Sequence, residues 1–412
     1  MSYVFGYVDV NNDMYVIAGS TTADTTHTFP QNQWTKAASD VKSAVISNED
    51  YNNACDGYID LNNNLYIWRS SRTPILIDTN VKQADSSEES MLVYVKNDNT
   101  LWMVDTQYPS YKRQVASNVD YVVLANYQMA YKSLDGKGYF STSTSWSSSP
   151  NASFYGVGFV QDVAVSGAVN GNFRRYMYID MNGTLYATAE SAYPSSSYSR
   201  IANGVKSTKK VGRGSIYLTL SNDLYHEASP GATPELIARN VSDYWENMTY
   251  ASTITGIFYT TIDNPTVLRS AKYYNNGTVP TPPTPIKKLG SSYNDNLAYI
   301  RIEVSASDDG ITFGSYAFFD PSNLPQKRFL KFRVILDGGT QMGEKKVFEF
   351  DQANPETKLV LNEFVSSINT NVQVNTVYKI DGIKNDNYTD GVLFEVPVDR
   401  TKYKFITKIE VV

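Results

Sequence analysis

Short apolar and aromatic runs, separated by Asn, Asp and Gly, recur along the first two-thirds of the chain. The segment Tyr7–Val16 has the pattern strand, tight turn, strand, and Tyr58–Ile67 repeats it almost letter for letter. Asn, Asp and Gly tolerate the positive φ values of tight turns, so each copy predicts a β-hairpin. Further copies are Tyr94–Trp102, Tyr131–Phe140, Tyr178–Tyr186, Tyr217–Tyr225 and a degenerate seventh, Phe258–Leu268.

A second pattern of strand, turn and strand lies between the hairpins, as in Ile75–Lys82, Gln114–Val119, Arg200–Lys206 and Leu236–Val241. Together with the hairpin it gives about four strands per unit, which is the content of one propeller blade. The hairpins start 36 to 51 residues apart, within the usual spacing of blades. We therefore expect an all-β protein whose residues 1–274 form a six- or seven-bladed β-propeller. Because the first and last units are irregular, a propeller with five blades is the alternative.

The alternation of an Asn-Val-Lys segment with a hairpin of the form Asn-Gly-Thr-Leu-Tyr, as at Asn182–Tyr186, resembles the RCC1-type repeat of seven-bladed propellers. The resemblance covers about residues 1–272 and extends only to the skeleton of the repeat. The Gly-rich W-G-x-N and G-Q-L-G elements of that family are missing here. Family activities such as nucleotide exchange on a small GTPase are therefore not implied.

Residues 275–288 contain Pro280, Pro282, Pro283 and Pro285, which predicts a stiff, extended linker and a domain boundary. Residues 289–412 show no trace of the repeat. Alternating runs there, at 298–305, 328–336, 392–398 and 402–411, predict a C-terminal antiparallel β-sandwich, with one short helix expected over 359–368. Ser307–Phe313 followed by the strand at 328–336 is similar to β-sandwich modules of phage tail and bacterial surface proteins.

Composition supports the β prediction, because the chain holds 32 Tyr and 17 Phe residues, which suit pleated, half-buried surfaces. The net charge of −6 and the absence of a Lys/Arg stripe argue against nucleic-acid binding. A single cysteine, Cys55, cannot form an internal disulfide. Neither a signal peptide nor a long apolar span is apparent, so we expect cytoplasmic synthesis and no membrane insertion.

Few residues suggest catalytic chemistry. The two histidines, His27 and His226, have no metal-binding spacing, and no known nucleophile or phosphate-binding motif occurs, so we expect no metal, no cofactor and no enzyme activity. Cys55 is interpreted as a core residue.

The turns that begin at Asp9 and Asp60 are interpreted as hairpin turns, because they lack the Gly and the bidentate Glu of a calcium loop. Two carboxylates converging in space would suffice for a glycoside hydrolase, which remains the enzymatic alternative.

Ser- and Tyr-rich loops follow the second strand of the third, fourth and fifth hairpins. Loops at one position of a repeat lie on one face of the assembled propeller, so we expect their aromatic residues to share a surface. Tyr and Trp combine apolar faces with polar edges, which suits stacking on sugars; the alternative is that each ring packs over its own blade. The candidate carbohydrate-binding residues are Tyr108, Tyr111, Trp146, Tyr193 and Tyr198, with Arg113 and Arg200 available for an anionic group.

These features, with the tail-module resemblance, lead us to expect a bacteriophage tail-fibre or baseplate receptor-binding protein. Its expected ligand is a bacterial surface polysaccharide or teichoic acid. By analogy with tail fibres we expect a virion protein that forms a trimer and contacts other tail or baseplate proteins. The alternatives are a glycan-degrading propeller enzyme and a propeller scaffold that binds another protein.

Overall fold

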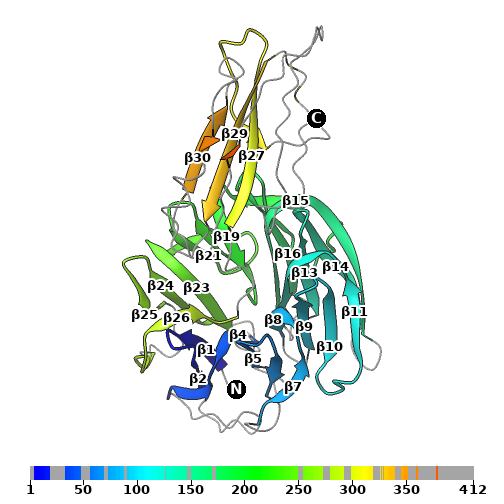
Figure 1. Ribbon diagram of the computed structural model, residues 1–412, viewed down its shortest axis with the longest axis vertical. Coiled ribbons are helices and arrows are strands. Elements are labelled where there is room, and N and C mark those ends of the chain that lie inside the picture. Colours follow the sequence, from blue (N-terminus) through cyan, green and yellow to red (C-terminus); the bar gives the residue numbers. More distant parts are fainter. Residues whose placement is uncertain are drawn as a thin grey trace. The chain divides into compact units, whose positions relative to one another are not determined.

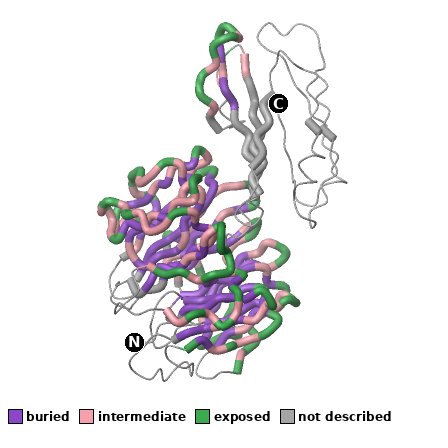
Figure 2. The backbone as a smooth tube through the Cα atoms, turned by 90° about the vertical axis from the view of Figure 1, so that its left-hand side faces the viewer, coloured by how far each residue is buried: buried purple, intermediate pink, exposed green. Residues whose placement is uncertain are grey.

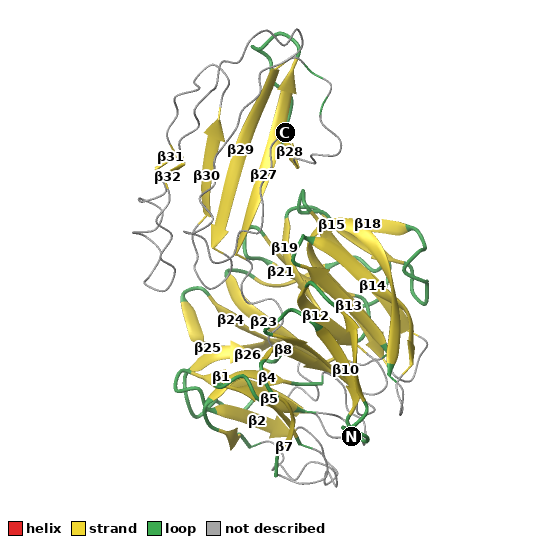
Figure 3. Cartoon of the chain, turned by 45° about the vertical axis from the view of Figure 1, so that its right-hand side comes forward, coloured by secondary structure: helices red, strands yellow, loops and turns green. Residues whose placement is uncertain are grey.

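The structure, a computed structural model, divides into two compact units, residues 1–294 and 295–412. It describes residues 4–18, 33–47, 56–68, 73–87, 91–125, 127–145, 150–168, 173–248, 254–271, 279–291, 298–318, 325, 327, 329–338, 345–350, 359–360 and 377–378. All regular elements in these ranges are strands, as expected for an all-β protein (Figure 3).

The first unit is a β-propeller with seven blades in its described part (Figure 1). Neighbouring strands within each blade are antiparallel and hydrogen-bonded, and the blades are named here in chain order. Blade 1 holds β26 (Ile286–Leu289), β1 (Val4–Asp9), β2 (Met14–Ala18) and β3 (Thr35–Ala38); blade 2 holds β4 (Val41–Val45), β5 (Gly57–Asp60), β6 (Leu65–Ile67) and β7 (Ile75–Asp78); blade 3 holds β8 (Val81–Ser86), β9 (Met91–Lys96), β10 (Leu101–Asp105) and β11 (Lys112–Ala116).

Blades 4 and 5 share one long strand, and blade 7 has three described strands. Blade 4 holds β12 (Val119–Ala125), β13 (Gln128–Ser133), β14 (Lys137–Ser145) and the first half of β15 (Asn151–Ala168); blade 5 holds the second half of β15, β16 (Phe173–Asp180), β17 (Leu185–Thr188) and β18 (Tyr198–Ala202); blade 6 holds β19 (Val205–Lys209), β20 (Ser215–Thr219), β21 (Leu224–Glu227) and β22 (Glu235–Ala238); blade 7 holds β23 (Val241–Met248), β24 (Ile254–Thr261) and β25 (Asn264–Ala271).

All seven predicted hairpins are confirmed, and in each blade they form the strands that follow the first strand. In the turn after β5, the Asp60 carboxylate accepts hydrogen bonds from the backbone N–H groups of Asn62 and Asn64, while Asn63 has a φ of 64°. Asp9 and Asp180 bind their own turns in the same way. These carboxylates therefore fix the hairpin turns, in line with the sequence interpretation.

Aromatic side chains face each other across these hairpins. Tyr7 lies opposite Tyr15 and Tyr58 opposite Tyr66, with stacked rings whose centroids are 5.3 and 5.1 Å apart. The same cross-strand stack recurs as Tyr131–Tyr139, Tyr178–Tyr186 and Tyr217–Tyr225. Much of the unusual Tyr content is thus explained by packing within the repeat, since cross-strand aromatic pairs stabilise a sheet.

The second sequence pattern connects one blade to the next. In Ile75–Lys82, β7 is the last strand of blade 2 and β8 is the first strand of blade 3, with Asn80 between them at a φ of 59°. Between blades 4 and 5 the turn is replaced by the 18-residue strand β15, in which Gly158 has a φ of 88°. Strand direction alternates within a blade, so these turns and the hairpin turns lie at one end of the blades, which we call the hairpin end. The remaining connections lie at the opposite end, the loop end.

The proline-rich segment closes the propeller, so the predicted boundary is wrong. Residues 279–291 belong to the first unit, and β26 forms the first strand of blade 1 by pairing with β1. The indole N–H of Trp34 donates to the Pro280 carbonyl at 2.7 Å, and Ile46 N–H donates to the Ser291 hydroxyl at 2.6 Å. The division between the units falls after Asn294, because the prolines lead directly into a strand of the ring.

Buried residues follow the strands of each blade, and exposed residues concentrate at the turns (Figure 2). In the second unit, β28 (Ala317–Phe318), β27 (Ala298–Ser307), β29 (Phe329–Gly338) and β30 (Lys345–Phe350) form an antiparallel sheet, which confirms two of the predicted strands. The segments at 392–398 and 402–411 lie outside the described residues, so the sandwich stays a prediction. Leu359–Val360 is a strand, β31, that pairs with β32 (Val377–Tyr378), and the rest of the predicted helix also lies outside the described residues.

Candidate functional site

The loop end carries the exposed tyrosines that the sequence singles out. Tyr108 and Tyr111 lie between β10 and β11 and are each 50% exposed. Their loop is ordered by two consecutive turns, in which Tyr108 N–H donates to the Asp105 carbonyl and Tyr111 N–H donates to the Tyr108 carbonyl, both at 2.9 Å. The two ring centroids are 6.3 Å apart with planes at 58°. This loop therefore presents two angled aromatic faces on a fixed backbone.

Cations lie beside this pair on β11. Arg113 is exposed, whereas Lys112 forms a 3.0 Å ion pair with Asp78 of blade 2. Burial alone would raise the pKa of Asp78, but hydrogen bonds from Lys112, Tyr94 and its own turn lower it to about 2. Asp78 consequently stays ionised at neutral pH and holds Lys112, so Arg113 is the better placed of the two cations for a ligand.

Tyr193 is more exposed than Tyr108 and Tyr111, at 57%, and lies between β17 and β18 in blade 5. The Arg174 guanidinium lies 4.4 Å from its ring centroid, a cation–π contact that covers one face of the ring. Nearby in the same end of the fold, Arg213 of blade 6 holds Glu190 of blade 5 through two hydrogen bonds of 2.8 and 3.1 Å. Sequence reasoning missed Arg174 and this bidentate pair, because their partners come from different loops.

The other candidates differ in position. Tyr198 is not an exposed platform: its ring packs edge-on against Tyr178 at 5.0 Å and its hydroxyl donates to the Pro194 carbonyl. Burial raises the pKa of that hydroxyl above its ordinary value. Tyr198 therefore packs over its own blade, as in the alternative given for each ring in the sequence analysis. Arg200 is exposed on β18, and Trp146 lies outside the described residues.

The two described loops that carry exposed candidates, between β10 and β11 and between β17 and β18, lie at the loop end. Tyr108 and Tyr111 belong to blade 3 and Tyr193 belongs to blade 5, so blade 4 lies between them. The described candidates therefore lie on two blades that a third blade separates, rather than in one compact cluster.

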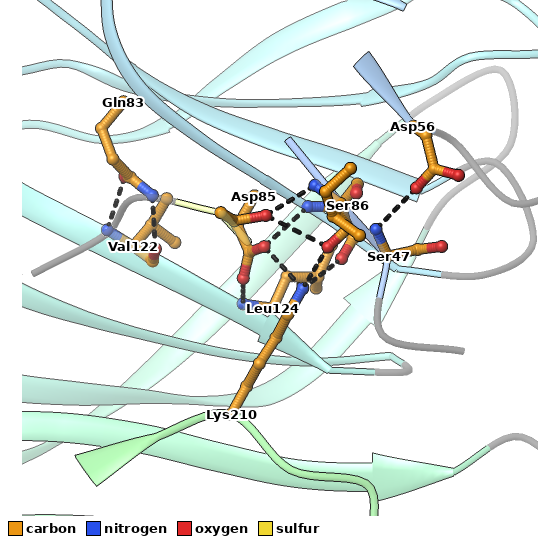
Figure 4. A network of polar contacts seen from close by, with 10 residues as sticks. Ser47, Asp56, Gln83, Asp85, Ser86, Val122, Leu124 and Lys210 are labelled. Carbon is orange, nitrogen blue, oxygen red and sulfur yellow. Dashed lines mark hydrogen bonds and ion pairs between the residues drawn. The ribbon is translucent and has the colours of Figure 1, made fainter. Parts of the chain in front are cut away.

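A buried ion pair lies at the centre of the propeller (Figure 4). Lys210 follows the first strand of blade 6, and its Nζ lies 2.6 Å from Asp85 Oδ1, 2.8 Å from the Ser86 carbonyl and 3.2 Å from the Ile46 carbonyl. Ser86 and Asp85 belong to blade 3 and Ile46 to blade 2, so the side chain crosses the propeller axis. Both charged side chains are fully buried. Burial raises the pKa of Asp85, and the ammonium of Lys210 opposes this.

Other buried carboxylates also have structural partners. Tyr121 donates to Asp162 at 2.5 Å, and Arg175 Nη1 lies 2.5 Å from Glu227. His226 Nε2 lies 3.2 Å from Glu246, with both side chains fully buried. These contacts join neighbouring blades, which gives the carboxylates a role in packing. Cys55, His27, Glu88 and Glu89 lie outside the described residues.

Within the described ranges, no three side chains among His, Cys, Asp and Glu converge as a metal site. Nor does that part of the chain contain a helix long and apolar enough to cross a membrane.

No known protein family and no curated protein sequence matches the chain. Among solved structures, human WBSCR16 is 10% identical, with 73% of this chain and 96% of that chain covered and a TM-score of 0.44. The β-propeller domain of Cps50 (Swd1) from Myceliophteria thermophila is 11% identical, with coverages of 61% and 89% and a TM-score of 0.42. A chain in the structure of Kap60 bound to yeast RCC1 (Prp20) is 10% identical, with coverages of 57% and 71% and a TM-score of 0.36. The propeller assignment rests on the strand order and closure described above.

Proposed function

We propose that this chain is a non-catalytic receptor-binding protein of a bacteriophage tail fibre or baseplate, and that its loop end binds a bacterial surface glycan. The observation that carries the proposal is the set of half-exposed tyrosines at the loop end of blades 3 and 5, Tyr108, Tyr111 and Tyr193. Aromatic faces bind the apolar faces of sugar rings, and Arg113 supplies charge for an anionic substituent such as a phosphate. The phage setting comes from the tail-module resemblance and is an analogy.

The two inclined tyrosine rings suit the binding of a glycan chain better than a flat apolar patch would. The Tyr108 and Tyr111 rings are inclined at 58°, so a chain of sugars can contact both as it turns. Their loop is held by backbone hydrogen bonds, so little further ordering is needed on binding. In this proposal the partners are a cell-wall polysaccharide or teichoic acid on one side and other tail proteins on the other, in a trimeric virion component.

The test is binding of the full chain to a glycan array and to purified wall polymers. Replacement of Tyr108, Tyr111 and Tyr193 by Ala should weaken binding about fivefold for each ring that contacts the ligand, since one aromatic contact contributes on the order of 1 kcal/mol. Phe159→Ala is the matched control, because Phe159 is an aromatic residue of blade 4 with 40% exposure outside these loops. Equal binding by the triple variant and the wild type would reject the loop end as the glycan site.

A further inference from the structure

The hairpin end carries exposed aliphatic side chains at one repeated position in five of the seven blades. Each of these residues directly follows the first strand of the hairpin, where the hairpin turn begins, and is 42–50% exposed. We call the set the aliphatic ring; it consists of Val10, Leu61, Leu134, Leu220 and Ile262. In blade 5 the same position holds the partly exposed Met181, and in blade 3 it holds Asn97.

The same backbone hydrogen bond fixes this position in six of the seven blades, all but blade 5. Leu61 N–H donates to the Asp40 carbonyl, Leu134 N–H to Asn118 and Leu220 N–H to Gly204, at 2.8 to 2.9 Å. Asn97 makes the same bond at 2.7 Å, so the turn forms with a polar side chain as well. Turn geometry therefore does not explain why the other blades use aliphatic residues, and repeated apolar exposure on one face is typical of an interaction surface.

Lysines lie at the same end of the blades. Lys42, Lys82, Lys206 and Lys287 are each the second residue of a first strand. Their ammonium groups donate to the side-chain oxygens of turn asparagines: Lys42 to Asn63 at 2.6 Å, Lys82 to Asn99 at 2.7 Å, Lys287 to Asn12 at 2.8 Å and Lys206 to Asn222 at 3.5 Å. These contacts hold the amines in place without cancelling their charge, because an amide is neutral. Lys82 also has Asp120 at 3.9 Å.

Several carboxylates of the hairpin end are already engaged. Asp60 accepts hydrogen bonds from its own turn, Asp13 pairs with Lys36 at 2.6 Å, and Asp135 pairs with Lys137 at 3.2 Å. Burial lowers the pKa of Lys42, and the nearby charge of Lys288 lowers it further. Cations therefore approach one another where the first strands begin, which favours a ligand that brings negative charge.

We propose that the hairpin end is a docking face for a protein segment that presents aliphatic and carboxylate side chains together. The aliphatic ring would bury apolar surface of the segment, and the lysines would pair with its carboxylates. A polyanion without apolar groups would leave the aliphatic ring in water, so it fits the surface less well. This face lies at the opposite end of the blades from the proposed glycan site, and the proposal stands independently of glycan binding.

The experiment selects short peptides from a random displayed library on the immobilised full chain. Peptides that also bind a Leu61→Ser, Leu134→Ser, Leu220→Ser variant are removed first. The expected survivors combine Asp or Glu with Leu, Ile or Val. A synthetic survivor should bind the wild type, lose affinity as salt is raised, and bind a Lys42→Gln, Lys287→Gln variant about tenfold more weakly.

Two matched controls keep the result specific to this face. Ile75→Ser, Leu76→Ser changes equally exposed aliphatic residues on the outer strand of blade 2 and should leave peptide binding unchanged. Arg113→Gln removes a cation from β11 and should also leave it unchanged. All substituted side chains are solvent-exposed, and each variant must melt at the wild-type temperature, which separates lost binding from lost folding.

Three outcomes would overturn the proposal. In the first, no peptide distinguishes the wild type from the serine variant, or the peptides bind the lysine variant equally well. In the second, inorganic polyphosphate binds the wild type and the serine variant alike and displaces the peptide, which would make the face an anionic-polymer site. In the third, sedimentation shows that the wild type self-associates and the serine variant does not, which would make the occupant a second copy of the chain.

Discussion

At the hairpin end the blades repeat the same backbone hydrogen bonds, whereas at the loop end each blade is built differently. Val81, Val119 and Val205 all begin first strands and all donate their N–H to the carbonyl of a hairpin residue, at 2.8 to 2.9 Å. At the loop end and at the centre of the propeller the contacts occur once each, as with Arg174 on Tyr193 and Lys210 on Asp85. Repetition therefore specifies the ring of blades, and the single contacts specify its surface and centre.

The largest effect should come from removing the closing strand. We expect a chain ending at residue 294 to melt cooperatively, and a chain ending at residue 278 to lose that transition. The shorter chain lacks β26, so β1 loses one of its two partner strands and the core loses the fully buried Leu289. Urea unfolding followed by circular dichroism would measure this. Equal midpoints for the two chains would show that closure by β26 does not stabilise the propeller.

The central ion pair should give the next largest effect. Lys210→Met leaves the Asp85 carboxylate buried without its cation, and we expect the free energy of unfolding to fall by about 3–5 kcal/mol. The double variant Lys210→Met, Asp85→Asn removes the charge and should recover part of that loss. Chemical denaturation of the three proteins measures it. A double variant less stable than the single variant would contradict an electrostatic origin.

The sequence predicted the repeated hairpins well, and it predicted the contacts that occur only once in the propeller poorly. All seven hairpins were predictable because local alternation and turn residues such as Asn63 and Asn182 specify them. The closure by β26 was not, since its prolines have the composition of a linker and its partner lies at the start of the chain. Lys210 and Asp85 are 125 positions apart, and nothing local indicates that they meet. Tyr198 shares the loop pattern of Tyr193, so only the packing against Tyr178 reveals its different role.

The pH dependence of stability should report another buried contact, that of Asp162 in β15. Burial raises its pKa to about 6, although it accepts hydrogen bonds from Tyr121 and Thr208 N–H. The folded state thus holds this proton more tightly than the unfolded state. Stability from this group is therefore fully present below about pH 4 and falls by up to about 3 kcal/mol as the pH rises through about 6.

The matched variant for that measurement is Asp162→Asn, which cannot titrate. Urea titrations of both proteins across pH 4 to 7 should show a difference in unfolding free energy that changes over this interval and is constant above it. Parallel pH profiles would mean that Asp162 does not titrate in this range.

The smallest effect concerns a turn of the hairpin end and separates backbone geometry from side-chain contacts. Asn118 joins β11 to β12 with a φ of 62°, and its carbonyl accepts the Leu134 N–H. Asn118→Gly should change stability little, because Gly adopts this conformation freely, whereas Asn118→Val should cost about 1–2 kcal/mol through the clash of its branched side chain. At the loop end, Tyr108→Ala should cost almost nothing, since half of that side chain is already in water. Thermal melts of the three variants would compare the two ends directly. If Tyr108→Ala costs as much as Asn118→Val, the loop end contributes to stability as the hairpin end does, and its tyrosines are explained by folding rather than by binding.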